Sequence, residues 1–255
     1  SIVIPEDDLN HQKSNRKVCL ITDYPDILIY YAFHFMVISL PLIFLPFTQE
    51  WYGLAKVTFF RIETLFILFC WLIKQLFLSE FKIKRTGIDF FVFAFVFLGL
   101  VSTLASSGPI ISFLGKYRRY EGFSTLLSYG LIFFLVNQSI FKTKKINSIL
   151  TSLVVTSGII SLYGILQFAG YDFISWNVSL WESNRSFSTL GNPVFLGGYL
   201  VLVLPLALVK YFNSNKPYAS FFYGLNIFLV VFCLIATFSR GSWIAGLVGF
   251  VLMLV

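Results

Sequence analysis

The chain has 255 residues, of which 57% are hydrophobic and only 12% are charged, and its mean hydropathy is +0.81. Soluble domains carry about 25% charged residues, so this composition excludes an ordinary soluble domain and indicates an integral membrane protein. The net charge of +7 does not indicate nucleic-acid binding, because basic residues that flank membrane spans account for it.

Apolar segments follow one another from residue 27 to the end of the chain. Residues 1–26 are polar and are predicted to form a cytoplasmic tail, whereas residues 27–255 are predicted to form a transmembrane helical domain, since a span needs about 20 mostly apolar residues. Seven segments are long enough and an eighth is cut short: 27–47, 57–77, 88–106, 123–141, 146–168, 194–212, 219–238 and 242–255. The predicted fold is therefore all-α, a polytopic bundle of seven complete spans plus a truncated eighth, and we expect it to be the N-terminal portion of a longer protein.

The distribution of Lys and Arg predicts the orientation. With the N-terminus in the cytoplasm, more of the 19 basic residues fall in inner segments than in outer ones, as the positive-inside rule requires. The longer outer loops are then 107–122 and 170–193. Lys56 and Arg61 also fall outside, and we interpret them as side chains that extend to lipid headgroups, with Glu63 and Glu50 as candidate partners of Arg61.

The first outer loop contains the basic and aromatic sequence GKYRRYEG at 115–122. Its charges suit an anionic headgroup or sugar phosphate, and its rings can stack on sugars. A headgroup anchor explains these residues equally well. The candidate substrate-binding residues of this loop are Lys116, Tyr117, Arg118, Arg119 and Glu121.

The second outer loop ends in an arginine and a turn. Pro193 restricts Asn192 to extended geometry and can open the next helix, whose free N–H groups favour an anion. Arg185 and Asn192 are thus candidates for a shared phosphate site. The alternative is a tight turn with tryptophans at the membrane interface.

The short turn FSRGS at 238–242 holds a second arginine, Arg240, at the edge of the hydrocarbon. A charged side chain is costly at this position, so we expect Arg240 to have a functional role. Guanidinium makes two-point contacts with phosphate, so we predict Arg240 and Arg185 as catalytic residues and Ser239 as a binding residue. The alternative is that Arg240 has a structural role and only caps the ends of the two adjacent helices. Acidic residues are few on this face, and paired carboxylates are missing, so we expect no metal and no cofactor.

Three blocks of the sequence resemble the O-antigen ligase and Wzy-type polymerase family of bacterial membrane glycosyltransferases. They are GKYRRYEGFSTLLSYG at 115–130, RSFSTLGNPVFLGGYL at 185–200 and FSRGSW at 238–243. The second resembles the family's arginine followed by a glycine-asparagine-proline turn, and the third resembles the serine-arginine-glycine that opens a span. The resemblance covers the C-terminal half of the chain.

The resemblance implies a function in cell-surface polysaccharide biosynthesis, such as that of lipopolysaccharide. Members of this family transfer a glycan from an undecaprenyl-diphosphate carrier to a glycan or lipid acceptor at the outer face of the bacterial cytoplasmic membrane. By motif match, Arg185 and Arg240 would hold the diphosphate without a metal. The family's proposed catalytic histidine lies in a large outer loop further along, so we expect the base to lie outside this chain and the fragment to be inactive.

Two other classes of function remain open. A transporter or flippase of lipid-linked oligosaccharide also needs arginines in a cavity, but the sequence has no convincing internal repeat. A membrane scaffold would tolerate lysine in place of the outer arginines.

Overall fold

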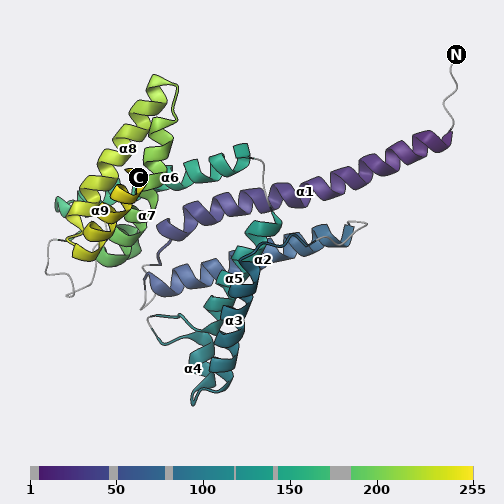
Figure 1. Cartoon of the computed structure of the whole chain (residues 1–255), viewed down its shortest axis with the longest axis horizontal. Coiled ribbons are helices and arrows are strands. Elements are labelled where there is room, and N and C mark those ends of the chain that lie inside the picture. The colour runs from purple at the N-terminus through teal and green to yellow at the C-terminus, as the bar shows by residue number, and fades with distance from the viewer. Residues whose placement is uncertain are drawn as a thin grey trace. The chain divides into compact units, whose positions relative to one another are not determined.

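The computed structural model describes residues 6–45, 51–77, 83–117, 119–139, 143–172 and 185–254 (Figure 1). Every regular element in these ranges is a helix, so the all-α prediction is confirmed. The chain divides into two compact units. The first unit comprises Ser1–Met36 and Val57–Lys142, and the second comprises Val37–Lys56 and Thr143–Val255.

The first unit is built on the long helices that begin the chain. Its elements are α1 (Glu6–Leu42, as far as Met36), α2 (Gly53–Phe77, from Val57), α3 (Asp89–Leu104), α4 (Pro109–Leu114) and α5 (Phe123–Gln138). The ring of Trp71 on α2 packs edge-on against Phe134 on α5, with centroids 5.1 Å apart. Lys74 on α2 forms an ion pair with Asp26 on α1 at 2.7 Å. Helix α3 lies against both α4 and α5.

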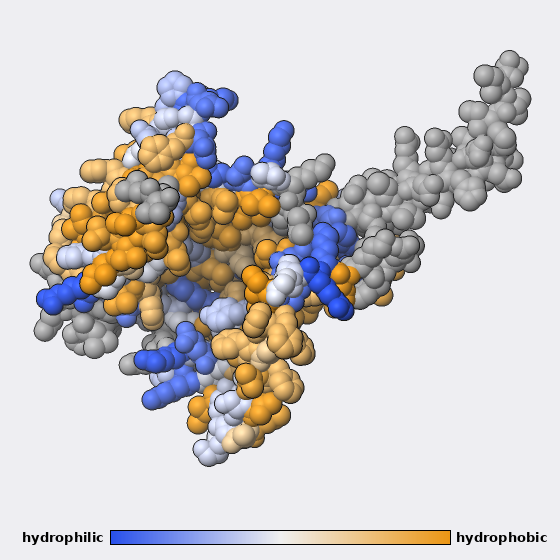
Figure 2. Space-filling view, in the orientation of Figure 1, coloured by the Kyte–Doolittle hydropathy of each residue, from blue (hydrophilic) through white to orange (hydrophobic). Residues whose placement is uncertain are grey.

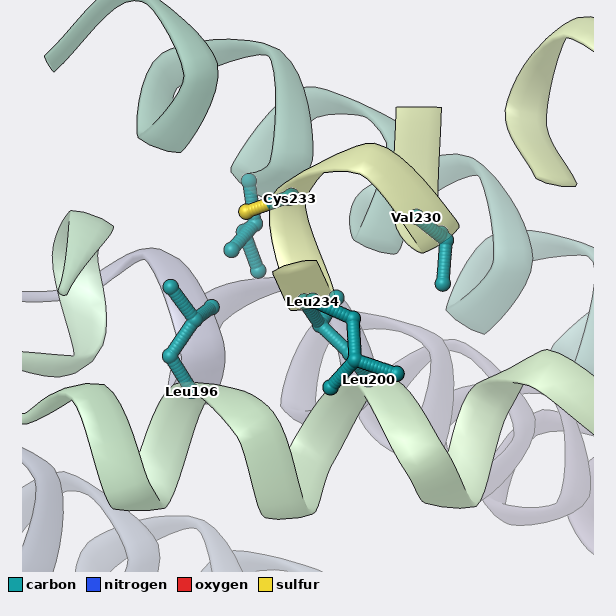
Figure 3. Close-up of a cluster of buried hydrophobic side chains, with 6 residues drawn as sticks. Leu196, Leu200, Val230, Cys233 and Leu234 are labelled. Carbon is teal, nitrogen blue, oxygen red and sulfur yellow. The ribbon is translucent and has the colours of Figure 1, made fainter. Parts of the chain in front are cut away.

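The second unit holds a compact helical core. Its elements are the end of α1, α6 (Thr143–Phe168), the short 3-10 helix η1 (Ser188–Leu190), α7 (Pro193–Phe212), α8 (Pro217–Ala236) and α9 (Arg240–Leu254). Helix α8 packs against α6 and α7, and α9 packs against α7. Figure 3 shows the buried cluster between them, where Leu196 and Leu200 of α7 meet Val230, Cys233 and Leu234 of α8. Cys233 in this core and Cys70 in the first unit are both buried free thiols.

Within the part of the chain that the structure describes, four helical segments are long and apolar enough to cross a membrane: Tyr24–Leu42, α6, α7 and α8. Figure 2 shows the hydrophobic side chains that α8 and α9 expose, as expected of a surface that faces lipid. The structure thus describes a membrane-embedded helical protein but does not confirm seven complete spans. Helices α3 and α5 have 16 residues each, which cover roughly 24 Å of a hydrocarbon core about 30 Å thick.

Lys56, in the first turn of α2, caps the end of α1. Its Nζ donates to the carbonyl oxygens of Leu40 at 2.9 Å, Pro41 at 3.1 Å and Ile43 at 2.8 Å. The last carbonyls of a helix have no partner within the helix, and a cation favours the negative end of the helix dipole. Burial lowers the pKa of this amine to about 7. Lys56 therefore points into the protein, and the expectation of a headgroup-facing side chain was wrong.

Close packing of α6 and α8 depends on Asn226. Its Nδ2 donates to the carbonyl oxygen of Val154 at 2.8 Å, and its side chain fills the space above Gly158, where a Cβ would collide with it. Polar side chains that bond across helices and glycines that let helices approach are the typical means of helix association in membranes.

We expect Asn226→Ala to lower the free energy of unfolding by about 1 kcal/mol, because it removes the hydrogen bond between α6 and α8 and leaves a void. Thermal unfolding in detergent micelles measures the change. Asn215→Ala, in the exposed turn between α7 and α8, is the matched control and should leave the melting temperature unchanged. Equal stability of the two variants would contradict this account of the interface.

Candidate functional site

The start of α7, the end of α8 and the start of α9 meet at one end of the second unit. Helices α7 and α8 form a pair joined by the short turn at 213–216, so the first turn of α7 lies near the last turn of α8. The backbone N–H of Ser186 donates to the carbonyl oxygen of Ala236 at 3.0 Å. The segment that leads into α7 is therefore attached to the C-terminus of α8.

Arg185 binds that helix end with its guanidinium group. Its Nε donates to the carbonyl oxygen of Thr237 at 2.9 Å, and its Nη2 donates to that of Phe238 at 3.3 Å. These bonds satisfy carbonyls that a helix end leaves without partners. A guanidinium has five N–H donors, and described residues of the chain engage two of them here. The remaining donors can bind an anion.

Arg240 lies at the same end, as the first residue of α9. Its side chain is exposed, and it follows Thr237 by three residues, which limits the separation of their Cα atoms to about 11 Å. The structure thus places Arg185 and Arg240, the two predicted catalytic residues, at the same end of the second unit, although 55 positions separate them in the sequence.

Hydrogen bonds and a strained backbone define the turn between α8 and α9. Phe238 adopts φ of +47°, a left-handed conformation that costs a bulky residue about 1–3 kcal/mol. Hydrogen bonds compensate: Thr237 Oγ1 accepts from the backbone N–H of Ser239 at 3.2 Å, and Trp243 Nε1 donates to the carbonyl oxygen of Leu234 at 2.9 Å. A strained backbone that the surroundings enforce is typical of functional sites.

Two predicted binding residues are occupied within the fold. The Oδ1 of Asn192 accepts from the N–H of Val194 at 2.8 Å and so caps α7, where Pro193 occupies the first turn as predicted. The hydroxyl of Ser239 is buried and lies 2.9 Å from that of Ser242, close to Gly197. The Nδ2 of Asn192 makes no hydrogen bond with described residues and can still donate to a ligand, whereas the buried hydroxyl of Ser239 is used within the fold.

A polar network beside the site was missed by the sequence analysis. Gln167, near the end of α6, accepts with Oε1 from the backbone N–H groups of Phe187 at 3.0 Å and Ser188 at 2.8 Å. Its Nε2 donates to Asp172 Oδ2, and the hydroxyl of Tyr163 donates to Oδ1 of the same carboxylate, both at 2.8 Å. The sequence feature that could have revealed this network is the presence of a glutamine and a tyrosine in the last turns of an apolar helix.

Tyr52 and Gly191 complete the packing around the start of α7. Gly191 has φ of +73°, and a Cβ there would overlap the ring of Tyr52. Burial raises the pKa of the Tyr52 phenol above its usual range, and the nearby Tyr163 and Asp172 raise it further. The Tyr52 side chain is therefore uncharged and packs against the turn at Gly191.

The remaining predicted residues belong to the first unit, in the turn that precedes α5. Lys116, Tyr117, Arg119 and Glu121 are exposed, and Arg118 lies outside the described residues. Arg61, expected to reach the headgroups, instead donates through Nη2 to Thr125 Oγ1 at 2.7 Å and to the carbonyl oxygen of Tyr120 at 3.2 Å. It therefore fixes this turn.

No protein-family model, curated protein or solved structure matches the chain. Among the described residues, no three His, Cys, Asp or Glu side chains lie together in a way that could hold a metal ion.

Gly191→Ala should destabilise the second unit by at least about 1–3 kcal/mol, because alanine is strained at this φ and its Cβ would displace the Tyr52 ring. The melting temperature of the purified protein reports the loss. Gly198→Ala, one turn into α7 with open space around it, is the control and should be neutral or slightly stabilising. A melting temperature of Gly191→Ala equal to that of the control would refute the proposed packing.

Proposed function

We propose that the chain is part of a membrane glycosyltransferase that transfers a glycan from an undecaprenyl-diphosphate carrier to a glycan or lipid acceptor. The observation that supports this proposal is the convergence of Arg185 and Arg240 at one end of the second unit. The sequence resemblance to O-antigen ligases and Wzy-type polymerases agrees with it. Two guanidinium groups in a site of low dielectric suit a diphosphate better than a single headgroup phosphate.

The proposed chemistry is a displacement at the anomeric carbon of the donor. The oxygen of an acceptor hydroxyl forms the new bond to this carbon and gives its proton to the base, which is expected outside this chain. The bond to the diphosphate oxygen breaks at the same time, and the diphosphate leaves with the electron pair. Negative charge therefore grows on the leaving group. The backbone carbonyls of Thr237 and Phe238 hold the Arg185 guanidinium in place before the reaction, so the stabilisation requires little reorganisation.

The proposed topology follows from the same site. The carrier presents its glycan at the outer face of the cytoplasmic membrane, so the end with Arg185 and Arg240 would face outward. The turn at 213–216, at the other end of the α7–α8 pair, would then face the cytoplasm, as would the N-terminus. The seven complete spans expected from the sequence are part of this proposal.

In the full-length protein, Arg185→Ala and Arg240→Ala should each lower glycan transfer by about 10²–10³-fold, because each removes a donor that stabilises the leaving group. Transfer of radiolabelled glycan from the lipid carrier measures the loss, and membrane fractionation confirms insertion. Lys216→Ala, a basic side chain exposed at the other end of the α7–α8 pair, is the control and should retain activity. Normal transfer in both arginine variants would overturn the proposal.

Cysteine labelling tests the topology. In a background without native cysteines, Gly241→Cys should react with a membrane-impermeant maleimide added to intact cells or spheroplasts. Asn215→Cys should react only after the membrane is permeabilised, because it lies at the opposite end of the α7–α8 pair. The reverse pattern would place the arginines in the cytoplasm and exclude the proposed donor.

A further inference from the structure

The first unit contains an open cavity of about 370 Å³ where α3 ends and α5 begins. Hydroxyl groups and one carboxylate dominate its polar lining: Ser102, Thr103, Ser112, Glu121, Thr125 and Tyr129. Ligand sites in proteins begin at about 300 Å³, so the cavity suits a small ligand of one or two rings.

Two of the polar groups are available for a ligand. The hydroxyl of Ser102 and the carboxylate of Glu121 make no hydrogen bond with the described residues of the chain, and both side chains are exposed. The hydroxyl of Thr103 donates to the carbonyl oxygen of Gly99 at 2.8 Å, so it can still accept a hydrogen bond from a ligand. Donors and acceptors thus line the same small volume.

Contacts within the protein hold the turn that carries Glu121 in place before any ligand binds. Arg61 bonds to Thr125 and to the carbonyl oxygen of Tyr120, and Thr125 Oγ1 donates to the same carbonyl at 2.8 Å. Gly122 packs so closely on the backbone of Gly115 that a Cβ would collide with it. A site held in this way loses little conformational entropy on binding.

The groups in the cavity match a polyhydroxylated ring. A carboxylate can accept hydrogen bonds from two neighbouring hydroxyls of a sugar, while serine and threonine hydroxyls both donate and accept. Phe123 and Leu126 complete the lining with apolar surface, which suits the C–H face of a sugar. A cation is disfavoured, because Glu121 is the single acidic residue in a turn that also carries Lys116 and Arg119.

We propose that this cavity binds a neutral sugar residue, with the Glu121 carboxylate accepting hydrogen bonds from its hydroxyls and Ser102 bonding to the opposite edge of the ring. The inference rests on the proposed function for the source of the sugar, which would be the glycan of the lipid-linked donor or of the acceptor. It does not depend on the two arginines of the second unit.

The test is saturation-transfer-difference NMR on the full chain in lipid nanodiscs, titrated with methyl glycosides of glucose, galactose and N-acetylglucosamine. At least one should bind the wild type in the millimolar range. Glu121→Gln should weaken that binding about tenfold or more, since it removes a charge-assisted acceptor. Ser102→Leu should abolish binding because the larger side chain fills the cavity, whereas Ser107→Leu adds the same bulk outside the lining and should bind as the wild type.

Three results would overturn the inference: no glycoside binds the wild type, Glu121→Gln and Ser102→Leu bind as the wild type does, or tetramethylammonium competes with the glycoside for the cavity. Circular dichroism melting curves establish that both variants fold. Arg240→Ala separates the two proposals, because it should lose glycan transfer while glycoside binding stays unchanged. Loss of glycoside binding in Arg240→Ala would place the sugar site elsewhere and contradict the cavity.

Discussion

The contact between the Arg185 guanidinium and the last carbonyls of α8 determines the arrangement of the second unit. A helix that ends at the membrane edge leaves backbone carbonyls without partners, and little water is present there to bind them. Arg185 supplies donors to Thr237 and Phe238, and the N–H of Ser186 supplies one to Ala236. These bonds hold the segment before α7 against the end of α8, so that Arg240 and the cap of α7 lie at the same end.

The same physical solution occurs at two other places in the chain. Lys56 binds three carbonyl oxygens where α1 ends, and Arg61 binds the carbonyl oxygen of Tyr120 in the turn before α5. In each case a cation near the hydrocarbon edge is retained because it satisfies backbone groups. A basic residue at a span end is therefore weak evidence of ligand binding on its own. Arg185 lies at the same end of the second unit as the exposed Arg240, and guanidinium donors of Arg185 make no bond with described residues.

Hydropathy predicted most of the helices well, because the length of an apolar segment indicates where a membrane-embedded helix begins and ends. The segment expected at 194–212 is α7, Pro193–Phe212, and the one expected at 146–168 lies within α6, Thr143–Phe168. Pro193 marked the start of α7 because its fixed φ suits a first helical turn. The short helix α4 was missed, since six residues leave no periodic signal, and the seven complete spans stay a prediction.

The candidate site was predicted in part, for reasons that concern tertiary contacts. The arginines stood out because a charge within an apolar sequence needs an explanation. The sequence does not reveal, however, that the hydroxyl of Ser239 is buried beside Ser242, or that Gln167 links Asp172 to the backbone before η1. The bond between Gln167 and Ser188 joins residues 21 positions apart, and no local pattern encodes it. The cavity at Glu121 was also hidden, because its walls come from three helices and a turn.

The most direct test of the account is a double-mutant cycle between Arg185 and Arg240, read out by calorimetric binding of farnesyl diphosphate to the full chain in nanodiscs. If both guanidinium groups hold one diphosphate, the effects of Arg185→Ala and Arg240→Ala on binding should not add, with a coupling free energy of about 1 kcal/mol or more. Strictly additive effects, or binding that neither substitution changes, would show that the two arginines do not form a common site.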